Sequence, residues 1–264
     1  MVIRVDVIGG DTGQALKKGS ERRNGDFVFV NNGSGDIVLH VDEGVMVTPK
    51  PGDGRPHYAL LAESPALRGV DKVYRVLTEN PSAIVDRFRK VFVYDPRHAH
   101  LPNVVRLAIA QPWIKNPRLY PKTKLCSMIT SSKAWVPGHR LRLAFAKQNC
   151  DKLDLFGRGI REIKTKEEGL RDYRFSVAFE NARWPGYFTE KIVDCFLTGT
   201  VPIYYGDPRI GDFFDVRGII VLAGSRLPHL TPALYDRMLP YVRDNYERAQ
   251  QFRRSRIQRL YDQL

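Results

Sequence analysis

The sequence predicts an α/β protein of two lobes, each built on a parallel β-sheet, that face each other across a cleft. Short β-rich runs alternate with helical segments along most of the chain, which is typical of parallel sheets with right-handed crossovers. A length of 264 residues is long for one domain and short for three, and 43% hydrophobic residues suffice for two cores. A turn-rich segment, "KNPRLYPKTK", separates two series of strands, so we expect lobes at residues 1–118 and 119–264.

The first lobe opens with β-rich runs separated by turn residues and continues with buried strands. Asn-Gly and Gly-Asp pairs mark the early turns, and the Pro/Gly loop "TPKPGDGRP" follows them. A helical turn, "SAIVDRF", precedes one of the later strands. The expected strands are "VIRVDVIG", "GDFVFVNNGSGD", "DIVLHVDEGVMV", "HYALLAES", "KVFVYDP" and "VVRLAIA".

The second lobe shows the more regular alternation of strands and helices. The expected strands are "KLCSMITS", "LDLFGRG", "RFSVAFE", "VPIYYG" and "GIIVLA". The expected helices are "GHRLRLAFAKQNC" and "TEKIVDCFLTG". Since ligands of parallel sheets bind at the carboxyl ends of the strands, we expect a site there.

The C-terminal segment "NYERAQQFRRSRIQRLYDQL" predicts an amphipathic helix. Ile257, Leu260, Tyr261 and Leu264 recur at helical spacing, with arginines on the other faces. We interpret it as a surface helix packed on the body of the protein, within the second lobe's residues 119–264. The alternative is a peripheral contact with a membrane.

Charge and cysteine content limit the function classes. The net charge of +13 indicates an anionic partner, which leaves nucleic acid, a membrane surface or a phosphate-bearing substrate open. Cys126, Cys150 and Cys195 lie far apart without a CxxC spacing, so we expect core cysteines in a reducing compartment and no zinc site. No apolar run approaches the roughly 20 residues of a membrane helix, and the start lacks a signal-peptide pattern. We therefore expect a soluble, cytoplasmic protein.

One turn in the second lobe carries an unusual number of polar groups. In "FSVAFENARWPGYFTEKIVDCFLTGTVPIYYGDP", Thr189 is the expected N-cap of a helix, and Glu190 suits its first turn. Lys191 does not, because a cation is disfavoured at the positive end of the helix dipole. An anion bound beside it would explain the lysine, and backbone N–H groups, the dipole and a lysine together form a phosphate site. Glu190 would then accept hydrogen bonds from ribose hydroxyls; a surface Glu-Lys pair is the alternative.

This stretch resembles the donor-binding signature of the α-1,3-fucosyltransferases, glycosyltransferase family 10. The family has a strand ending in Phe-Glu-Asn, a Tyr-x-Thr-Glu-Lys run that opens the next helix, and a strand like "VPIYYG". Two further segments are similar to family segments. "GHRLRLAFAKQNCDKLDLFGRG" places Arg140 where the family has an arginine on the donor diphosphate, and "YALLAESPAL" places Glu63 at the proposed catalytic base.

The resemblance implies the GT-B arrangement of two Rossmann-like lobes, a GDP-sugar donor and a glycan acceptor held by the first lobe. The implied reaction is inverting transfer of fucose, in which Glu63 takes the proton of the acceptor hydroxyl as general base. The sequence contains no Asp-x-Asp triplet, so we expect cationic side chains, and no metal, to stabilise the diphosphate. The residues expected to bind the donor are Arg140, Glu180, Asn181, Tyr187, Glu190 and Lys191.

Alternatives remain open at single residues and for the whole chain. Glu63 would otherwise cap the turn "SPAL", Glu180 would be structural, and Tyr187 would pack in the core. The fold could also serve another GDP-sugar or nucleotide-sugar donor, or be a non-catalytic, lectin-like relative. The competing class is a basic protein that binds nucleic acid or another polyanion, although the basic residues are dispersed and no nucleic-acid-binding motif is present.

Overall fold

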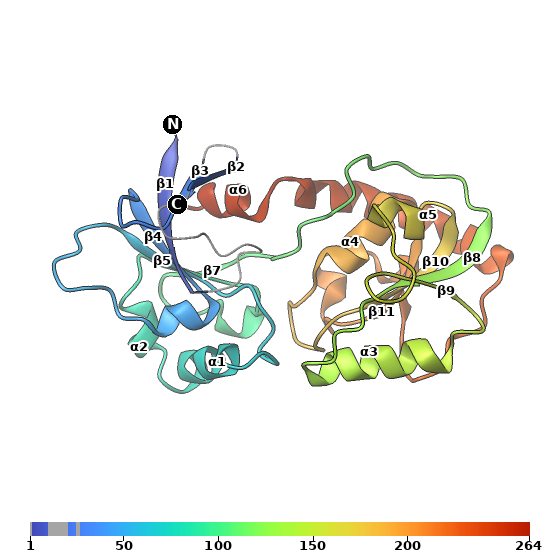
Figure 1. Cartoon of the computed structure of the whole chain (residues 1–264), viewed down its shortest axis with the longest axis horizontal. Coiled ribbons are helices and arrows are strands. Elements are labelled where there is room, and N and C mark those ends of the chain that lie inside the picture. Colours follow the sequence, from blue (N-terminus) through green and yellow to red (C-terminus); the bar gives the residue numbers. More distant parts are fainter. Residues whose placement is uncertain (1, 10–20, 25–26) are drawn as a thin grey trace. The chain divides into compact units, whose positions relative to one another are not determined.

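The computed structural model describes residues 2–9, 21–24 and 27–264, and the chain divides into two compact units (Figure 1). Unit 1 comprises Met1–Ala108 and Ile257–Leu264, and unit 2 comprises Ile109–Arg256. Each unit is an α/β structure with its own sheet, as the sequence predicts.

Unit 1 is built on a seven-stranded sheet with the order β2-β3-β1-β4-β5-β6-β7. All its pairs are parallel except the pair of β2 and β3. Central strands β4 and β5 are buried along their whole length, which explains their continuous apolar runs. The strands are β1 (Ile3–Ile8), β2 (Glu21–Asn24), β3 (Phe27–Val30), β4 (Ile37–Val41), β5 (His57–Leu60), β6 (Lys90–Val93) and β7 (Val104–Arg106).

The helices of unit 1 differ in how well the sequence predicts them. The predicted helical turn is α2 (Ser82–Val85), but the longer α1 (Val70–Glu79) was not predicted. Its buried residues Val70, Val73, Tyr74 and Leu77 follow the i, i+3, i+4, i+7 pattern of an amphipathic helix, so the signal was present. Two residues of the predicted run "GDFVFVNNGSGD", 25 and 26, lie outside the described residues.

Unit 2 has a five-stranded parallel sheet with the order β12-β11-β10-β8-β9. Its strands are β8 (Lys124–Ile129), β9 (Asp154–Phe156), β10 (Tyr173–Phe179), β11 (Val201–Tyr205) and β12 (Ile220–Val221). The chain runs from β8 outward to β9, then returns to β10 on the other side of β8 and continues to β11. The strand order therefore reverses between β8 and β10, the position at which open α/β sheets bind ligands.

Three helices flank this sheet: α3 (Pro137–Gln148), α4 (Glu190–Leu197) and α5 (Pro232–Gln250). Helix α3 lies on one face, and α4 and α5 lie on the other (Figure 1). The predicted apolar face of α4 is buried, and Gly199 ends the helix with a φ of 72°, a left-handed conformation that suits glycine.

The C-terminal segment is not the single helix that the sequence predicts. Helix α5 ends at Gln250, a short 3₁₀ turn follows, and α6 (Arg256–Tyr261) belongs mainly to unit 1. Tyr261 meets Phe27 of β3 edge-on at 5.2 Å between ring centroids, and Leu260 is 1% exposed. The apolar face therefore packs on unit 1, so residues 257–264 do not belong to the second lobe to which the predicted bounds of 119–264 assign them.

The boundary between the units also differs from the predicted residue 118. Residues 109–118 belong to unit 2 because their backbone bonds to α4: the Trp113 N–H donates to Asp194, and the Arg118 N–H donates to the Leu197 carbonyl. Of the cysteines, Cys126 and Cys195 are buried as expected, whereas Cys150 is exposed. Among the described residues, no helix is both long and apolar enough to cross a membrane.

Candidate functional site

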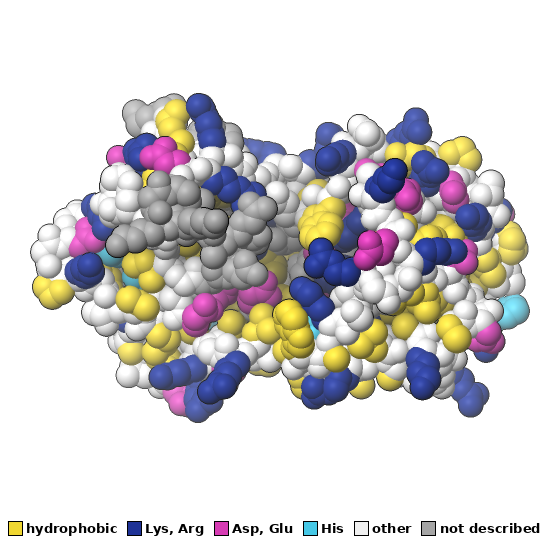
Figure 2. All heavy atoms as spheres, in the orientation of Figure 1, with side chains coloured by type: hydrophobic (Ala, Val, Ile, Leu, Met, Phe, Trp, Pro, Cys, Tyr) yellow, Lys and Arg dark blue, Asp and Glu magenta, His cyan; other side chains and the backbone are white. Residues whose placement is uncertain are grey.

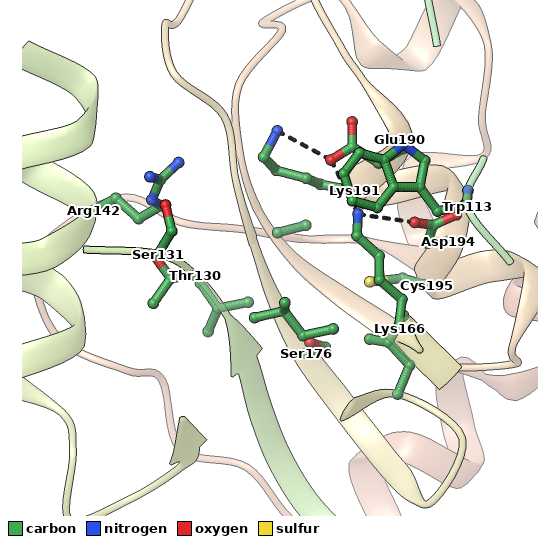
Figure 3. Close-up of a pocket in the computed structure, with 14 residues that line it drawn as sticks. Trp113, Thr130, Ser131, Arg142, Lys166, Ser176, Glu190, Lys191, Asp194 and Cys195 are labelled. Carbon is green, nitrogen blue, oxygen red and sulfur yellow. Dashed lines mark hydrogen bonds and ion pairs between the residues drawn. The ribbon is translucent and has the colours of Figure 1, made fainter. Parts of the chain in front are cut away.

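A cavity of about 190 Å³ lies in unit 2 where the strand order reverses (Figure 3). Residues after β8, the body of β10 and the first turns of α4 form its wall, and Trp113 and Lys166 complete it. The polar lining side chains are Thr130, Ser131, Arg142, Lys166, Ser176, Glu190, Lys191 and Asp194. A second cavity of about 490 Å³ shares Trp113, Lys166 and residues 129–131 with the first.

Glu180 fixes the start of α4 and the position of Lys191. The Glu180 side chain is fully buried at the end of β10 and accepts hydrogen bonds from the Thr189 N–H at 2.8 Å and from Lys191 Nζ at 2.9 Å. Thr189 occupies the predicted N-cap position, but its hydroxyl bonds Glu180 and does not cap the helix. The buried Glu180 carboxylate thus holds Lys191 at the start of the helix. The negative charge expected beside Lys191 is therefore supplied in part by a protein side chain.

Lys191 keeps capacity for a further partner. Its ammonium donates to Glu180 and to Thr189 Oγ1, while the Glu190 carboxylate lies 3.6 Å away, beyond hydrogen-bond distance. An ammonium has three N–H groups, so one is left for a ligand. Burial would lower the pKa of Lys191, but the carboxylates of Glu180 and Glu190 outweigh it and hold that pKa above its ordinary value. The ammonium is therefore charged at neutral pH.

Lys166 links two carboxylates of α4 that are one helical turn apart. Its Nζ donates to Glu190 Oε1 at 3.0 Å and to Asp194 Oδ2 at 3.1 Å. Burial would raise the pKa of Glu190, but Lys191 and Lys166 hold it well below its ordinary value. Burial also raises the pKa of Asp194 to about 6, with the Lys166 charge opposing that rise. Glu190 is thus firmly ionised, and one of its oxygens faces Lys166.

Asp194 also holds the segment that carries Trp113. Its Oδ1 accepts hydrogen bonds from the backbone N–H groups of Trp113 at 2.8 Å and Ile114 at 3.3 Å. The Lys166 ammonium lies 4.3 Å from the centre of the Trp113 ring, a cation–π contact. Trp113 is nevertheless 64% exposed. A large aromatic ring is therefore fixed at the rim of the cavity with much of its surface accessible.

Arg142 lies across the cavity from Trp113 (Figure 3). Arg142 is 6% exposed, and its Nη1 donates to Asn181 Oδ1 at 2.9 Å. Arg142 Nε and Thr130 Oγ1 are both buried, and neither has a hydrogen-bond partner among the described residues. Leaving buried donors unpaired costs about 1–3 kcal/mol each, so their arrangement around one cavity indicates a site that can bind a ligand.

A close approach of α3 to the loop after β10 brings Arg142 into the site. Gly138 is the second residue of α3, and a Cβ at this position would lie 1.8 Å from the Asn181 carbonyl oxygen. Only glycine allows this contact without a shift of the backbone. Four residues later the same helix face presents Arg142.

Arg140 is not brought to the site. Its side chain is exposed and is not among the residues that line either cavity; its guanidinium donates to the Ala134 carbonyl at 3.4 Å. The arginine of α3 that lines the cavity is Arg142, because the buried face of α3 includes residues 138, 142, 145 and 146. Residue 140 falls on the opposite side of a helix with 3.6 residues per turn.

The other predicted donor residues are placed as follows. Glu190 and Lys191 line the cavity, while Glu180 and Asn181 lie behind it and hold Lys191 and Arg142. Tyr187 is 2% exposed and does not line either cavity, so it has the core position that was its alternative. The sequence analysis missed Lys166, Asp194 and Trp113.

Glu63 lies in unit 1, three residues after β5 ends. Its backbone is fixed by the buried Asp42, whose Oδ1 accepts the N–H groups of Ala62 at 2.8 Å and Glu63 at 2.9 Å. The Tyr94 hydroxyl donates to the Glu63 carbonyl at 2.9 Å. The backbone is held on both sides, and the side chain is half-buried.

The described residues contain no group of three or more His, Cys, Asp or Glu side chains that could hold a metal ion. The cations around the first cavity, Arg142, Lys166 and Lys191, are balanced by Glu180, Glu190 and Asp194. Binding of an anion here would rest on directed N–H groups more than on net charge.

Residues 119–213 match the family model "Glycosyltransferase family 10 (fucosyltransferase) C-term". The α-(1,3)-fucosyltransferase FucT of Helicobacter pylori is 40% identical over 58 residues, 22% of this chain and 12% of that protein. The GDP-fucose protein O-fucosyltransferase 3 of Rattus norvegicus is 36% identical over 78 residues, 30% of this chain and 16% of that protein. These matches thus span less than a fifth of each relative's length.

The structure is similar to a crystal structure of an α1,3-fucosyltransferase with GDP, with a TM-score of 0.51 at 15% identity. The likeness covers 96% of this chain and 82% of that chain. It shows a shared fold, the GT-B arrangement of two α/β units that the sequence analysis predicts. Residues 119–213 are thus similar to the C-terminal domain of glycosyltransferase family 10, the family that the motif of the second lobe resembles.

Proposed function

We propose that the protein transfers fucose from GDP-fucose to a hydroxyl of a glycan acceptor, with inversion and without a metal ion. The family and the GDP-fucose named for its relatives support the donor. The observation that carries the proposal is the pair of unsatisfied buried donors, Arg142 Nε and Thr130 Oγ1, beside the Lys191 ammonium in a cavity of the family domain.

The diphosphate would bind between α3 and α4. Arg142 offers Nε, Thr130 its hydroxyl and Lys191 one N–H, which together can reach several phosphate oxygens. The first turn of α4 adds unpaired backbone N–H groups and the positive end of a helix dipole. As the sugar–phosphate bond breaks, these donors stabilise the charge that develops on GDP.

Glu190 would bind the ribose hydroxyls. Lys166 keeps its carboxylate charged and holds one oxygen at 3.0 Å, which leaves the other as an acceptor. Glu180 and Asn181 act as positioning residues in this proposal, because their polar contacts are with Lys191 and Arg142.

The acceptor hydroxyl needs a base because an alcohol is a poor nucleophile. In the proposal Glu63 takes the hydroxyl proton while the oxygen attacks the anomeric carbon from the face opposite GDP. The C–O bond to the acceptor forms, the C–O bond to the β-phosphate breaks, and GDP leaves. The backbone of Glu63 is held by hydrogen bonds to Asp42 and Tyr94, which suits a residue that must present its carboxylate in a fixed position.

Calorimetric titration with GDP, UDP and ADP, first in EDTA and then with Mn²⁺, tests the proposal. We expect binding in EDTA with a preference for GDP, followed by GDP release from GDP-fucose when a suitable glycan is supplied. Binding only with Mn²⁺ would contradict the metal-free reaction, and an equal affinity for all three nucleotides would contradict the donor.

The same titration separates the enzyme from a polyanion-binding protein. Lys and Arg side chains are spread over the visible face of both units and do not gather in one patch (Figure 2). Duplex nucleic acid should therefore bind weakly and lose affinity steeply with salt. Tight nucleic-acid binding together with no nucleotide binding would favour the competing class.

A further inference from the structure

The second cavity of unit 2 has the chemistry of a guanine pocket. Resting on the proposed function, we propose that it holds the base of the donor, that Glu162 recognises the guanine N1–H and 2-amino group, and that Trp113 packs against the ring. The cavity measures about 490 Å³ and is lined by loop 157–166 together with Trp113 and residues that follow β8.

The two cavities are connected by shared walls. Trp113, Lys166 and residues 129–131 line both, including Thr130, whose buried hydroxyl lacks a partner. Suppose that the phosphates lie between Thr130 and Arg142 and that the ribose contacts Glu190. The base of the nucleotide would then extend past the residues that line both cavities. The larger cavity is therefore the next space available to the donor.

The loop that carries Glu162 is anchored at both ends. At its start the Gly157 N–H donates to the Arg161 carbonyl at 2.8 Å, and a Cβ at Gly157 would lie 1.7 Å from the Thr130 carbonyl oxygen. At its end Thr165 and Glu168 form a capping box. Glu162 stands between the two anchors, so its backbone is preorganised without its side chain taking part.

The Glu162 carboxylate is available to a ligand. It is exposed, lines the cavity, and has no hydrogen bond or ion pair among the described residues. Its neighbour Arg161 does not neutralise it: that guanidinium lies 3.5 Å from Asp154 and 3.9 Å from the centre of the Phe156 ring. The wall of the cavity thus carries several cationic side chains and one carboxylate, that of Glu162, whose two oxygens are free to accept hydrogen bonds.

This combination matches guanine and not adenine. Guanine presents N–H donors at N1 and the 2-amino group and acceptors at O6 and N7, whereas adenine presents an amino donor at N6. A carboxylate accepts the two adjacent guanine donors, and Lys133, Arg158 or Lys164 on the cavity wall can donate to O6 and N7. Adenine would leave the carboxylate facing its N1 acceptor.

Trp113 supplies the apolar surface that a base needs. Lys166 covers part of the ring at 4.3 Å, and Asp194 fixes the backbone, yet the side chain is 64% exposed. Stacking of a base on an aromatic side chain is worth about 1–3 kcal/mol in other nucleotide sites. Exposure of a fixed indole at the cavity rim is explained if a base covers it.

The test is a titration of the whole chain and its Glu162→Gln variant with GDP, IDP and ADP. IDP differs from GDP only by the missing 2-amino group. For the wild type we expect GDP to bind roughly tenfold more tightly than IDP; in Glu162→Gln this difference should shrink to about twofold or less. Glu247→Gln, the same change at an exposed residue of α5, is the matched control and should retain the wild-type ratio.

Trp113 is tested by a second pair of variants. Trp113→Ala should weaken GDP and IDP binding by the same factor, roughly tenfold, and Trp113→Phe should restore most of the loss. Selective, tight GDP binding that is unchanged in both Glu162→Gln and Trp113→Ala would overturn this inference and leave the proposed function standing. If the wild type binds no GDP, both are overturned.

Discussion

Replacing one or the other of two arginines in α3 tests the site most directly, because Arg140 and Arg142 are two residues apart and only Arg142 lines the cavity. Arg142→Ala removes a buried guanidinium with an unpaired Nε, and its Nη1 bond to Asn181. Arg140→Ala removes an exposed side chain whose bond to a carbonyl is long, at 3.4 Å. The pair changes charge equally, so any difference in GDP affinity reflects position.

The magnitude follows from the hydrogen bonds that a phosphate would make. Charged hydrogen bonds contribute about 1.5–3 kcal/mol, so Arg142→Ala should raise the Kd for GDP roughly 10- to 150-fold. Arg142→Lys should recover only part of this, because an ammonium lacks the planar fork. Arg140→Ala should change the Kd less than about twofold, because solvent and salt screen the charge of an exposed side chain.

Calorimetry at fixed ionic strength measures these affinities, and thermal denaturation of each variant confirms that it is folded. A large loss of GDP affinity in Arg140→Ala, with Arg142→Ala close to wild type, would refute the placement of the diphosphate. It would also restore the assignment that the sequence motif alone suggests.

Three further predictions concern catalysis, pH and packing. Glu63→Gln should retain GDP affinity within about twofold and abolish fucose transfer, since an amide cannot take the proton; equal loss of both in calorimetry and transfer assays would contradict the base. Asp194 has a folded pKa raised from 3.8 to about 6, so its contribution to stability is greatest below pH 4 and falls by on the order of 3 kcal/mol as pH rises through 6. Urea unfolding of the wild type and of Asp194→Asn at pH 4.5 and 7 measures the free energy of unfolding of both. If the difference between the two proteins is the same at both pH values, the raised pKa of Asp194 is contradicted. Gly138→Ala should lower the free energy of unfolding by about 1–3 kcal/mol, because its methyl group meets the Asn181 carbonyl at 1.8 Å; an unchanged melting temperature would show that the contact relaxes without cost.

The elements of unit 2 are largely predictable because their patterns are local. Helix α4 follows from Ile192, Val193, Phe196 and Leu197 at helical spacing and from Gly199 at its end. The same reasoning, applied to α3, would have separated its two arginines: Arg142 shares a face with Gly138 and Phe145, and Arg140 does not. The spacing of the motif alone does not distinguish the two arginines, because it ignores which face of the helix each one occupies.

The remaining site residues meet only through tertiary structure. Lys166 lies 24 residues before Glu190, and Trp113 lies 81 residues before Asp194, and no periodicity connects them. The return of residues 257–264 to unit 1 is equally non-local, because it includes the contact of Tyr261 with Phe27, which is far from it in the sequence. Such pairings need the folded chain.

The anchoring of loop 157–166 has a consequence for how donor preference can change. Gly157, Thr165 and Glu168 set the course of the backbone, and none of them is the side chain that would contact the base. Substitutions at 158 and at 162–164 would therefore alter recognition at little cost to folding. Under the proposed function, such a scaffold would allow one nucleotide sugar to be exchanged for another by a few point substitutions, while the proposed diphosphate site around Arg142 and Lys191 stays unchanged.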